Sequence, residues 1–513
     1  MKIERTKNAI RNTKWGFLQR LANILLPFVV RTVLIHTLGA EYGGLSSLFT
    51  SILSILSLTE LGFSSAIVYS MYKPIAEDDR DKICALLNVY RKAYLVIGSI
   101  ILAIGLMLVP VLPKLIKDDV PADVNLYVLY AIYLINNVIS YFLYGYKTSL
   151  LSAHQREDVL SKNILLYTLA LYGAQCVVLL AFKDFYLFTI LIPLSTVLLN
   201  ILNNRAVSQM FPDYRPRGTI GTADRDELKK NLTGLMFSKV GAATRNTFDS
   251  IVVSMFLGLT SVAMYNNYFY IVSGVNAFLV VLMNAITAGV GNKIAVDSPE
   301  SNYEDFNMFH FLYMWLAGWC TVCMMCLYQP FMRLWMGESL MFPNYIMFLF
   351  CYYFMMMKQG DISSVYYSAA GLWWHGKLRF IIEAVLNLSL NFVLGKYYGV
   401  AGIILATIIS FTCIYFYGSK FLFTEYFKNG KLGKFYVDNV LYMLATGLVG
   451  FCTFIIVEWL TGTFASPLLV LVTRLFVCLL LPNVLFLLIY GISHKNRDYI
   501  SRAVSIVRNQ LGL

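Results

Sequence analysis

The stretch WGFLQRLANILLPFVVRTVLIHTL, residues 15–38, decides the fold class of this chain. Only Arg20 and Arg31 carry a full charge within it at neutral pH. A helix needs roughly 20 mostly apolar residues to cross a bilayer. We therefore predict a transmembrane helix here, and a retained one, because the apolar run is too long for the hydrophobic region of a cleaved signal peptide.

Apolar runs of this kind recur along the whole chain. Of its 513 residues 58% are hydrophobic and 14% are charged, whereas soluble domains carry roughly 25% charged residues. The sequence thus predicts an all-α integral membrane protein with about fourteen transmembrane helices. These spans are expected near residues 15–38, 43–72, 86–113, 123–146, 158–182, 185–204, 232–257, 261–290, 305–328, 341–370, 377–395, 400–424, 437–460 and 465–491.

The longest polar break in the chain, rich in Pro, Gly and charge, suggests a division into two lobes of six helices. A weak repeat supports two parallel lobes, because Arg20 aligns with Lys239 and Leu38-Gly39 with Leu257-Gly258 at one fixed offset. The predicted parts are an N-lobe at 1–204, a cytoplasmic linker at 205–230, a C-lobe at 231–424, two further spans at 425–492 and a basic amphipathic tail at 493–513.

The formal net charge of +12 follows from basic residues placed between the apolar runs. If the N-terminus is cytoplasmic, the loops on the opposite side are short and hold few basic residues: Lys114, Lys117, Lys183, Arg333 and Lys396. This bias predicts cytoplasmic N- and C-termini. Membrane orientation therefore accounts for the charge, and we expect no nucleic-acid partner. The short external loops argue against a receptor or a surface enzyme.

Motifs for catalysis and cofactor binding are missing from the sequence. The segment GLWWHGKL, residues 371–378, resembles a P-loop, but Leu378 replaces the hydroxyl that binds Mg²⁺, and we interpret the segment as an interfacial turn. Cys320, Cys323 and Cys326 recur every three residues without a histidine in the run. A metal site is conceivable there, but packing is favoured because a free cysteine behaves as a small hydrophobe. We expect no catalytic residue, no metal and no cofactor.

Several charges lie inside predicted spans, where an ionisable residue costs at least ~2.5–3.5 kcal/mol and so usually faces a cavity or a partner. Arg20 and Arg31 are separated by about three helical turns, which places them on one face of the first span. Arginine binds phosphate oxygens with two donors. The candidate cations for a pyrophosphate-binding cavity are Arg20, Arg31, Lys239, Arg245 and Lys358.

The acids inside the spans are candidates for coupling transport to H⁺ or Na⁺: Asp249, Asp361, Glu60 and Glu383. Asp249 lies four residues after Arg245 and Asp361 three residues after Lys358, so both can form ion pairs. Glu60, in LTELGFSSAI, is either a polar anchor at a helix kink or a coupling carboxylate. Snorkelling or structural ion pairing is favoured for the remaining charges, Arg91, Lys92, Glu458 and Arg474.

Four stretches carry a resemblance to a known family: RLANILLPFVVRTVLIHTLGAEYGGLSSLFTSI (20–52), ELGFSSAIVYSMYKPIAEDDRDKICALLNVYRKAY (60–94), SYFLYGYKTSLLSAHQREDVLSKN (140–163) and LGKYYGVAGIILATIIS (394–410). The chain resembles the polysaccharide flippases of the MATE-like exporter superfamily. These proteins move undecaprenyl-pyrophosphate-linked oligosaccharides across the bacterial inner membrane. The resemblance implies two six-helix lobes around a central cavity, two additional C-terminal helices and alternating access. It also implies cavity cations at Arg20, Arg31 and Lys239, and acids on the helices of Asp249 and Asp361.

The favoured hypothesis is therefore a multi-pass flippase of the bacterial inner membrane. Its expected partners are a lipid-linked oligosaccharide, membrane lipids, and a polysaccharide polymerase with its assembly machinery. An ion-coupled multidrug antiporter of the same fold and a peptidoglycan-precursor flippase remain open alternatives. A membrane-integral glycan polymerase is disfavoured, because it would need larger external loops bearing catalytic residues.

Overall fold

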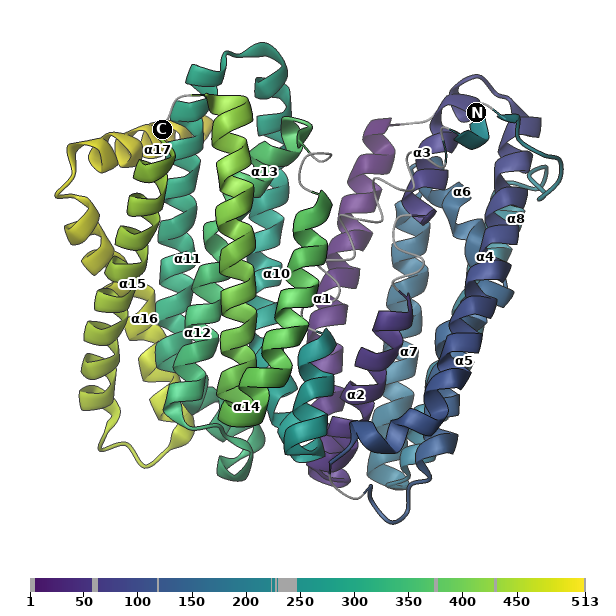
Figure 1. The fold of residues 1–513 in the computed structure, drawn as a ribbon, viewed down its shortest axis with the longest axis horizontal. Coiled ribbons are helices and arrows are strands. Elements are labelled where there is room, and N and C mark those ends of the chain that lie inside the picture. Colours follow the sequence, from purple (N-terminus) through teal and green to yellow (C-terminus); the bar gives the residue numbers. More distant parts are fainter. Residues whose placement is uncertain are drawn as a thin grey trace. The chain divides into compact units, whose positions relative to one another are not determined.

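The computed structural model describes residues 5–57, 63–117, 120–222, 224–226, 228, 247–372, 377–428 and 431–511. Within these ranges the regular elements are helices, and no strand is present (Figure 1). The chain divides into two compact units, unit 1 at Met1–Ala263 and unit 2 at Met264–Leu513. The all-helical prediction is thus confirmed.

Side-chain caps fix the starts of α4, α5 and α8 in unit 1. Asp79, Asn125 and Asp184 each accept a hydrogen bond from a backbone N–H in the first turn of the following helix. The longest packing interface joins α1 to α7, and α5 packs on α8. The helices are α1 (Arg5–Thr37), α2 (Ala40–Leu56), α3 (Phe63–Ala76), α4 (Arg80–Leu108), α5 (Leu126–Phe142), α6 (Thr148–Ala153), α7 (Glu157–Ala181) and α8 (Phe185–Met210).

Unit 2 contains most of α10, which begins at the end of unit 1, and all the later helices. Helix α11 begins with Ser298 as its cap and ends at Gly337, whose φ of 81° is accessible to glycine without strain. The helices are α10 (Leu259–Val296), α11 (Pro299–Met336), α12 (Asn344–Gln359), α13 (Asp361–Ala369), α14 (Lys377–Phe421), α15 (Leu432–Thr461), α16 (Pro467–Tyr490) and α17 (His494–Leu511).

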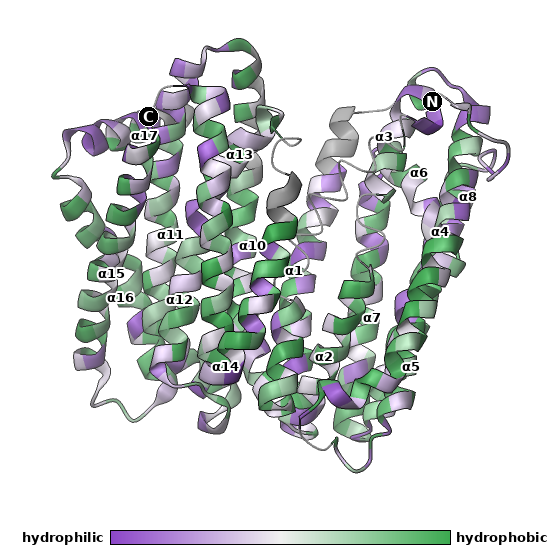
Figure 2. Ribbon diagram, in the orientation of Figure 1, coloured by the Kyte–Doolittle hydropathy of each residue, from purple (hydrophilic) through white to green (hydrophobic). Residues whose placement is uncertain are grey.

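Nine helices in the described part of the chain are long and apolar enough to cross a membrane, or ten if the bent pair of α5 and residues 145–153 forms one span. Figure 2 shows the apolar length of α15 and α16 and the hydrophilic α17 that follows them. The protein is therefore a multi-pass membrane protein. The figure of about fourteen spans stays a prediction.

Four predicted spans differ in detail from the helices observed. The predicted span at 43–72 contains the end of α2 at Leu56 and the start of α3 at Phe63, and the one at 341–370 divides at Gly360. The spans at 377–395 and 400–424 fall in the single helix α14, which is interrupted at Gly399, where φ is 58°. Hydropathy alone does not register such breaks, because they leave the average apolar character unchanged.

Apolar packing and close backbone approach stabilise each unit. Phe49 packs edge-on against Tyr130, whose hydroxyl donates to the Gly105 carbonyl at 3.0 Å. A Cβ atom on Gly44 would lie 2.1 Å from the Leu259 carbonyl oxygen, so only glycine allows this contact. In unit 2, the predicted packing role suits the cysteines of α11, because Cys326 is buried in an apolar cluster.

Candidate functional site

Arg31, in the C-terminal part of α1, is the half-buried cation of unit 1 that the sequence predicts for substrate binding. Its guanidinium donates from Nη1 to the Ser47 hydroxyl of α2 at 3.1 Å and from Nη2 to the Ala263 carbonyl at 3.2 Å. These contacts hold the planar group in one orientation within a spanning helix. Arg20 lies on the same helix with an exposed side chain.

Lys358 and Asp361 form the buried ion pair that their spacing predicts. The Lys358 ammonium, whose side chain is 2% exposed, lies 2.8 Å from Asp361 Oδ2, and it donates to Asn276 Oδ1 at 2.6 Å. Tyr313 of α11 also donates a hydrogen bond to Asp361. Four helices of unit 2, α10 to α13, therefore supply one polar cluster. Because Lys358 is already engaged by an acid and an amide, its role is better explained by this cluster than by direct substrate contact.

Glu383 begins a second polar row, which runs along α14. Its side chain is buried, as are those of Asn387 and Asn391 at successive four-residue steps. Asn387 donates to Thr407 Oγ1 at 3.1 Å and accepts from Asn391 Nδ2 at 3.2 Å. Ser410 is a further acceptor for Asn387, at 3.3 Å. The break at Gly399 folds α14 back on itself so that its two halves share this row of side-chain oxygens.

The other predicted site residues divide into one that the structure describes and three that it does not. Asp249 is buried in the helical segment that ends at Leu257. Lys239, Arg245 and Glu60 lie outside the described residues. Their predicted roles, including the pairing of Arg245 with Asp249, therefore stay predictions.

Arg474 and Glu458 form an ion pair, as the structural interpretation of these charges expects. Arg474 Nη2 lies 3.0 Å from Glu458 Oε1. The same guanidinium donates to Thr461 Oγ1 at 3.1 Å and to the Cys326 carbonyl at 3.3 Å. These contacts join α11, α15 and α16, so Arg474 is a structural residue.

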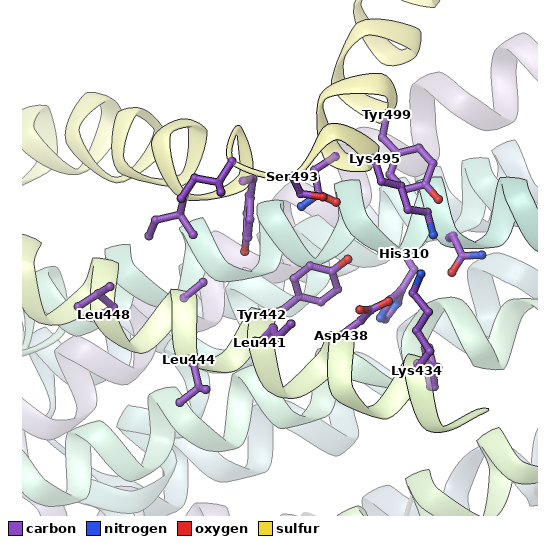
Figure 3. A pocket seen from close by; sticks show the side chains of 17 residues that line it. His310, Lys434, Asp438, Leu441, Tyr442, Leu444, Leu448, Ser493, Lys495 and Tyr499 are labelled. Carbon is purple, nitrogen blue, oxygen red and sulfur yellow. The ribbon is translucent and has the colours of Figure 1, made fainter. Parts of the chain in front are cut away.

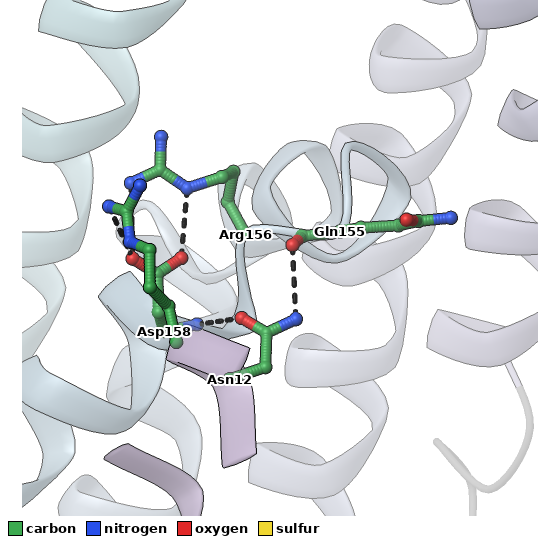
Figure 4. Close-up of polar contacts among 5 residues, drawn as sticks. Asn12, Gln155, Arg156 and Asp158 are labelled. Carbon is green, nitrogen blue, oxygen red and sulfur yellow. Dashed lines mark hydrogen bonds and ion pairs between the residues drawn. The ribbon is translucent and has the colours of Figure 1, made fainter. Parts of the chain in front are cut away.

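A polar cluster that the sequence did not single out ties the start of α1 to the loop before α7 (Figure 4). Asp158 accepts from Arg11 Nη2 and from Arg156 Nε, both at 2.8 Å. Asn12 accepts from the Asp158 backbone N–H at 2.7 Å and donates to the Gln155 carbonyl at 3.1 Å. The sequence offered little indication of this cluster, because its residues lie near helix ends, where charged and polar side chains are common.

A second set that sequence reasoning missed consists of asparagines within apolar helices of unit 1. Asn200 of α8 donates to Ser140 Oγ of α5 at 2.9 Å, and Asn163 of α7 donates to Asn203 of α8 at the same distance. Asn136 accepts from Thr196 at 2.8 Å. Asparagines three or four residues apart in an apolar run could have singled out these residues. Only charged residues inside the spans were considered from the sequence, and the asparagines were not included.

The comparison with protein families gives one decisive match. A family model described as "Polysaccharide biosynthesis protein" matches residues 9–287, which is more than half of the chain. The chain belongs to this family. No curated protein shows significant sequence similarity to it.

Solved structures with the same fold are transporters of the MOP superfamily. A structure titled "Lipid II flippase MurJ, inward closed conformation" matches with a TM-score of 0.67 and 15% identity, covering 96% of this chain and 100% of the other. An inward-facing multidrug resistance MATE family transporter matches with a TM-score of 0.59 and 12% identity, over 80% of this chain and 96% of that one. At such identities the likeness shows the fold alone. The expected MATE-like architecture is thus confirmed.

In this member of the polysaccharide biosynthesis family, the buried polar groups therefore lie in a fold that solved transporters share. Arg31 offers a fixed planar donor group suited to an anionic oxygen. The Lys358–Asp361 cluster and the α14 row offer carboxylates surrounded by hydroxyl and amide oxygens, which suit the exchange of a proton or a small cation.

Proposed function

We propose that this protein is a flippase, which translocates oligosaccharide repeat units linked to undecaprenyl pyrophosphate across the bacterial inner membrane by alternating access, for polysaccharide biosynthesis. The family match and the flippase-type fold support this proposal. The observation that carries it is Arg31, a cation held at a fixed orientation within an apolar spanning helix. An arginine there suits a pyrophosphate and disfavours a cationic drug.

In this proposal, Arg31 and Arg20 contact the pyrophosphate, together with Lys239 and Arg245. Lys358 acts indirectly, because its ammonium is engaged by Asp361 and Asn276. Binding of the anion would offset the repulsion among these cations and so favour the change between the two access states. The protein needs no catalytic residue or cofactor for this activity.

The energy source would be an ion gradient, with H⁺ or Na⁺ as the coupling ion. Buried carboxylates are the groups that such an ion can neutralise. The candidates are Asp249, Asp361, Glu60 and Glu383, of which Glu383 has amide and hydroxyl oxygens in the same helix. We further propose that both termini are cytoplasmic and that a polysaccharide polymerase and its assembly machinery receive the product.

The test is the distribution of lipid-linked oligosaccharide between the two leaflets in a strain that lacks the protein. Deletion is expected to leave this lipid on the cytoplasmic leaflet. Complementation with Arg31→Ala should leave transport about 10- to 100-fold below wild type, the loss expected for one or two charge-assisted hydrogen bonds. Arg31→Lys should retain part of the activity.

The matched control is Arg333→Ala, which removes an exposed arginine paired with Glu338 at 3.0 Å. It should transport normally. If Arg31→Ala, expressed at the wild-type level, moves the oligosaccharide as well as Arg333→Ala does, the pyrophosphate role of Arg31 is wrong.

The alternative of an ion-coupled multidrug antiporter is favoured by one observation, the burial of Asp249 and Glu383. It predicts cation efflux that depends on these acids and is indifferent to Arg31→Ala. A peptidoglycan-precursor flippase shares the proposed anion chemistry. It would instead leave the peptidoglycan precursor on the cytoplasmic leaflet when the protein is depleted.

A further inference from the structure

A pocket of about 500 Å³ opens in unit 2 where α15 begins, α16 ends and α17 starts. Its polar lining lies at one end, with Lys434 and Asp438 from α15 and Lys495 and Tyr499 from α17 (Figure 3). Apolar side chains continue the pocket along α15, away from the charges, and Figure 3 places Leu444 and Leu448 at this far end. Both leucines are exposed. The pocket is therefore amphipathic along its length.

The order of these groups matches the order of groups in a phospholipid. Helices α15 and α16 are spanning helices, and the hydrophilic α17 runs across their ends (Figures 1 and 2). The charged end of the pocket therefore lies at the depth of lipid headgroups, and the leucines lie at the depth of acyl chains. A lipid seated here would keep the orientation that it has in the bilayer.

The charges of the pocket favour an anion with a single negative charge. No salt bridge joins Lys434 or Lys495 to a carboxylate within the part of the chain that the structure describes, although Asp438 faces the same space. The Lys495 ammonium lies 5.3 Å from the centre of the Tyr499 ring. Two ammonium groups and one carboxylate leave a net charge of one positive unit, which a phosphodiester would neutralise.

Two buried polar atoms in the lining lack partners among the described residues, and one of them is an acceptor that calls for a hydrogen-bond donor on the ligand. His310 donates from Nε2 to Asn439 Oδ1 at 3.0 Å, because the Asn439 amide nitrogen is used for the Phe435 carbonyl at 2.8 Å. The other ring nitrogen, Nδ1, is then an acceptor. Among the described residues, neither this atom nor the Tyr490 hydroxyl has a hydrogen-bond partner. Buried polar atoms are rarely left in this state unless a ligand or water satisfies them.

We propose that this pocket is a binding site for an anionic glycerophospholipid with a hydroxyl-bearing headgroup, of the phosphatidylglycerol type. Lys434 and Lys495 contact the phosphodiester. The headgroup hydroxyls donate to Asp438 and to His310 Nδ1, and an acyl chain lies along Leu444 and Leu448. This inference is independent of the transported substrate, since the site is built from α11, α15, α16 and α17 alone.

The test is lipid binding to the purified full-length protein in detergent, measured by native mass spectrometry. Phosphatidylglycerol and phosphatidylcholine with identical acyl chains are compared, and glycerol 3-phosphate serves as the free headgroup. We expect phosphatidylglycerol to bind at least about tenfold more tightly than either. Lys434→Gln with Lys495→Gln should weaken its binding roughly 30-fold, because each lysine near the membrane surface contributes about fivefold.

The matched control is Arg497→Gln with Arg502→Gln, which removes the same charge from α17 at residues that do not line the pocket. His310→Phe, which keeps a ring but removes the acceptor, should lower the preference for phosphatidylglycerol over phosphatidylcholine. Equal binding of the two lipids, or equal losses in the lysine and arginine variants, would overturn the proposal. Binding of glycerol 3-phosphate as tight as that of the lipid would also overturn it, because the pocket would then hold a free phosphate ester. If the double lysine variant is not monodisperse, each single variant is tested against Arg497→Gln.

Discussion

Removing the negative charge of the Lys358–Asp361 pair tests the energetics of the buried cluster in unit 2. Loss of one partner of a buried ion pair costs about 3–5 kcal/mol, because the other charge stays buried and uncompensated. Asp361→Asn would leave the ammonium of Lys358, which is 2% exposed, with the Asn276 amide oxygen. Since Asp361 itself is 27% exposed and water can reach the site from its side, we expect the lower end, about 3 kcal/mol.

Removing the positive charge of the pair should lower the free energy of unfolding by less, because Asp361 is more exposed than Lys358. Lys358→Met keeps the length of the side chain and leaves Asp361, which retains the hydrogen bond from Tyr313 and partial contact with solvent. We expect a loss of about 1–2 kcal/mol from this change. The double variant removes both charges and should be more stable than Asp361→Asn alone, giving a coupling free energy between the two sites.

Thermal unfolding of the purified protein in detergent measures these differences. At roughly 2 °C for each kcal/mol in a unit of this size, Asp361→Asn should lower the Tm by about 6 °C. The control is Glu338→Gln, which opens the exposed pair with Arg333 and should shift the Tm by no more than about 2 °C. A Tm for Asp361→Asn equal to that of wild type, or a larger loss for Lys358→Met, would refute this account of the cluster.

Two further predictions concern stability in unit 1. Gly44→Ala places a Cβ 2.1 Å from the Leu259 carbonyl oxygen and should cost about 1–3 kcal/mol, while Gly447→Ala, with nothing within 4 Å, should be neutral in the same thermal assay. Burial lowers the pKa of His154 below its usual 6.5, and its ring packs 4.4 Å from that of Phe211. Because the unfolded chain then binds the proton more readily, stability should fall as the pH drops below about 6.5. His154→Phe should make the Tm less dependent on pH between 7 and 5, and an unchanged dependence would assign the effect to other groups.

The fold class could be predicted from the sequence because hydropathy is an average over a whole helix, and such averages tolerate local exceptions. The breaks at Gly360 and Gly399 could not, because they depend on the backbone conformation of one residue. Gly399 has a φ of 58°, and this turn brings Thr407 into hydrogen-bonding contact with Asn387. The spacing of residues within one predicted span does not reveal a contact that depends on such a turn.

The ion pair of Lys358 with Asp361 could be predicted, since its partners are three positions apart and about one helical turn brings them together. The Asp158 cluster could not, because Arg11 and Asp158 are brought together by the packing of α1 on α7. Local spacing predicts local pairs, whereas partners distant in the sequence require the tertiary arrangement. The asparagine contacts between α5, α7 and α8 could not be predicted either, because their partners are also distant in the sequence.

Arg31 and Arg474 show why a charge in an apolar helix does not by itself identify a functional site. Arg474 is neutralised by Glu458 and gives its other donors to Thr461 and a backbone carbonyl, so its contacts account for its burial. Arg31 donates to the Ser47 hydroxyl and to the Ala263 carbonyl, and these contacts orient its guanidinium. Neutral acceptors orient a guanidinium without cancelling its charge, whereas the carboxylate of Glu458 cancels most of the attraction of Arg474 for an anion. Substitution of Arg474 should therefore lower stability first, and substitution of Arg31 should lower transport first.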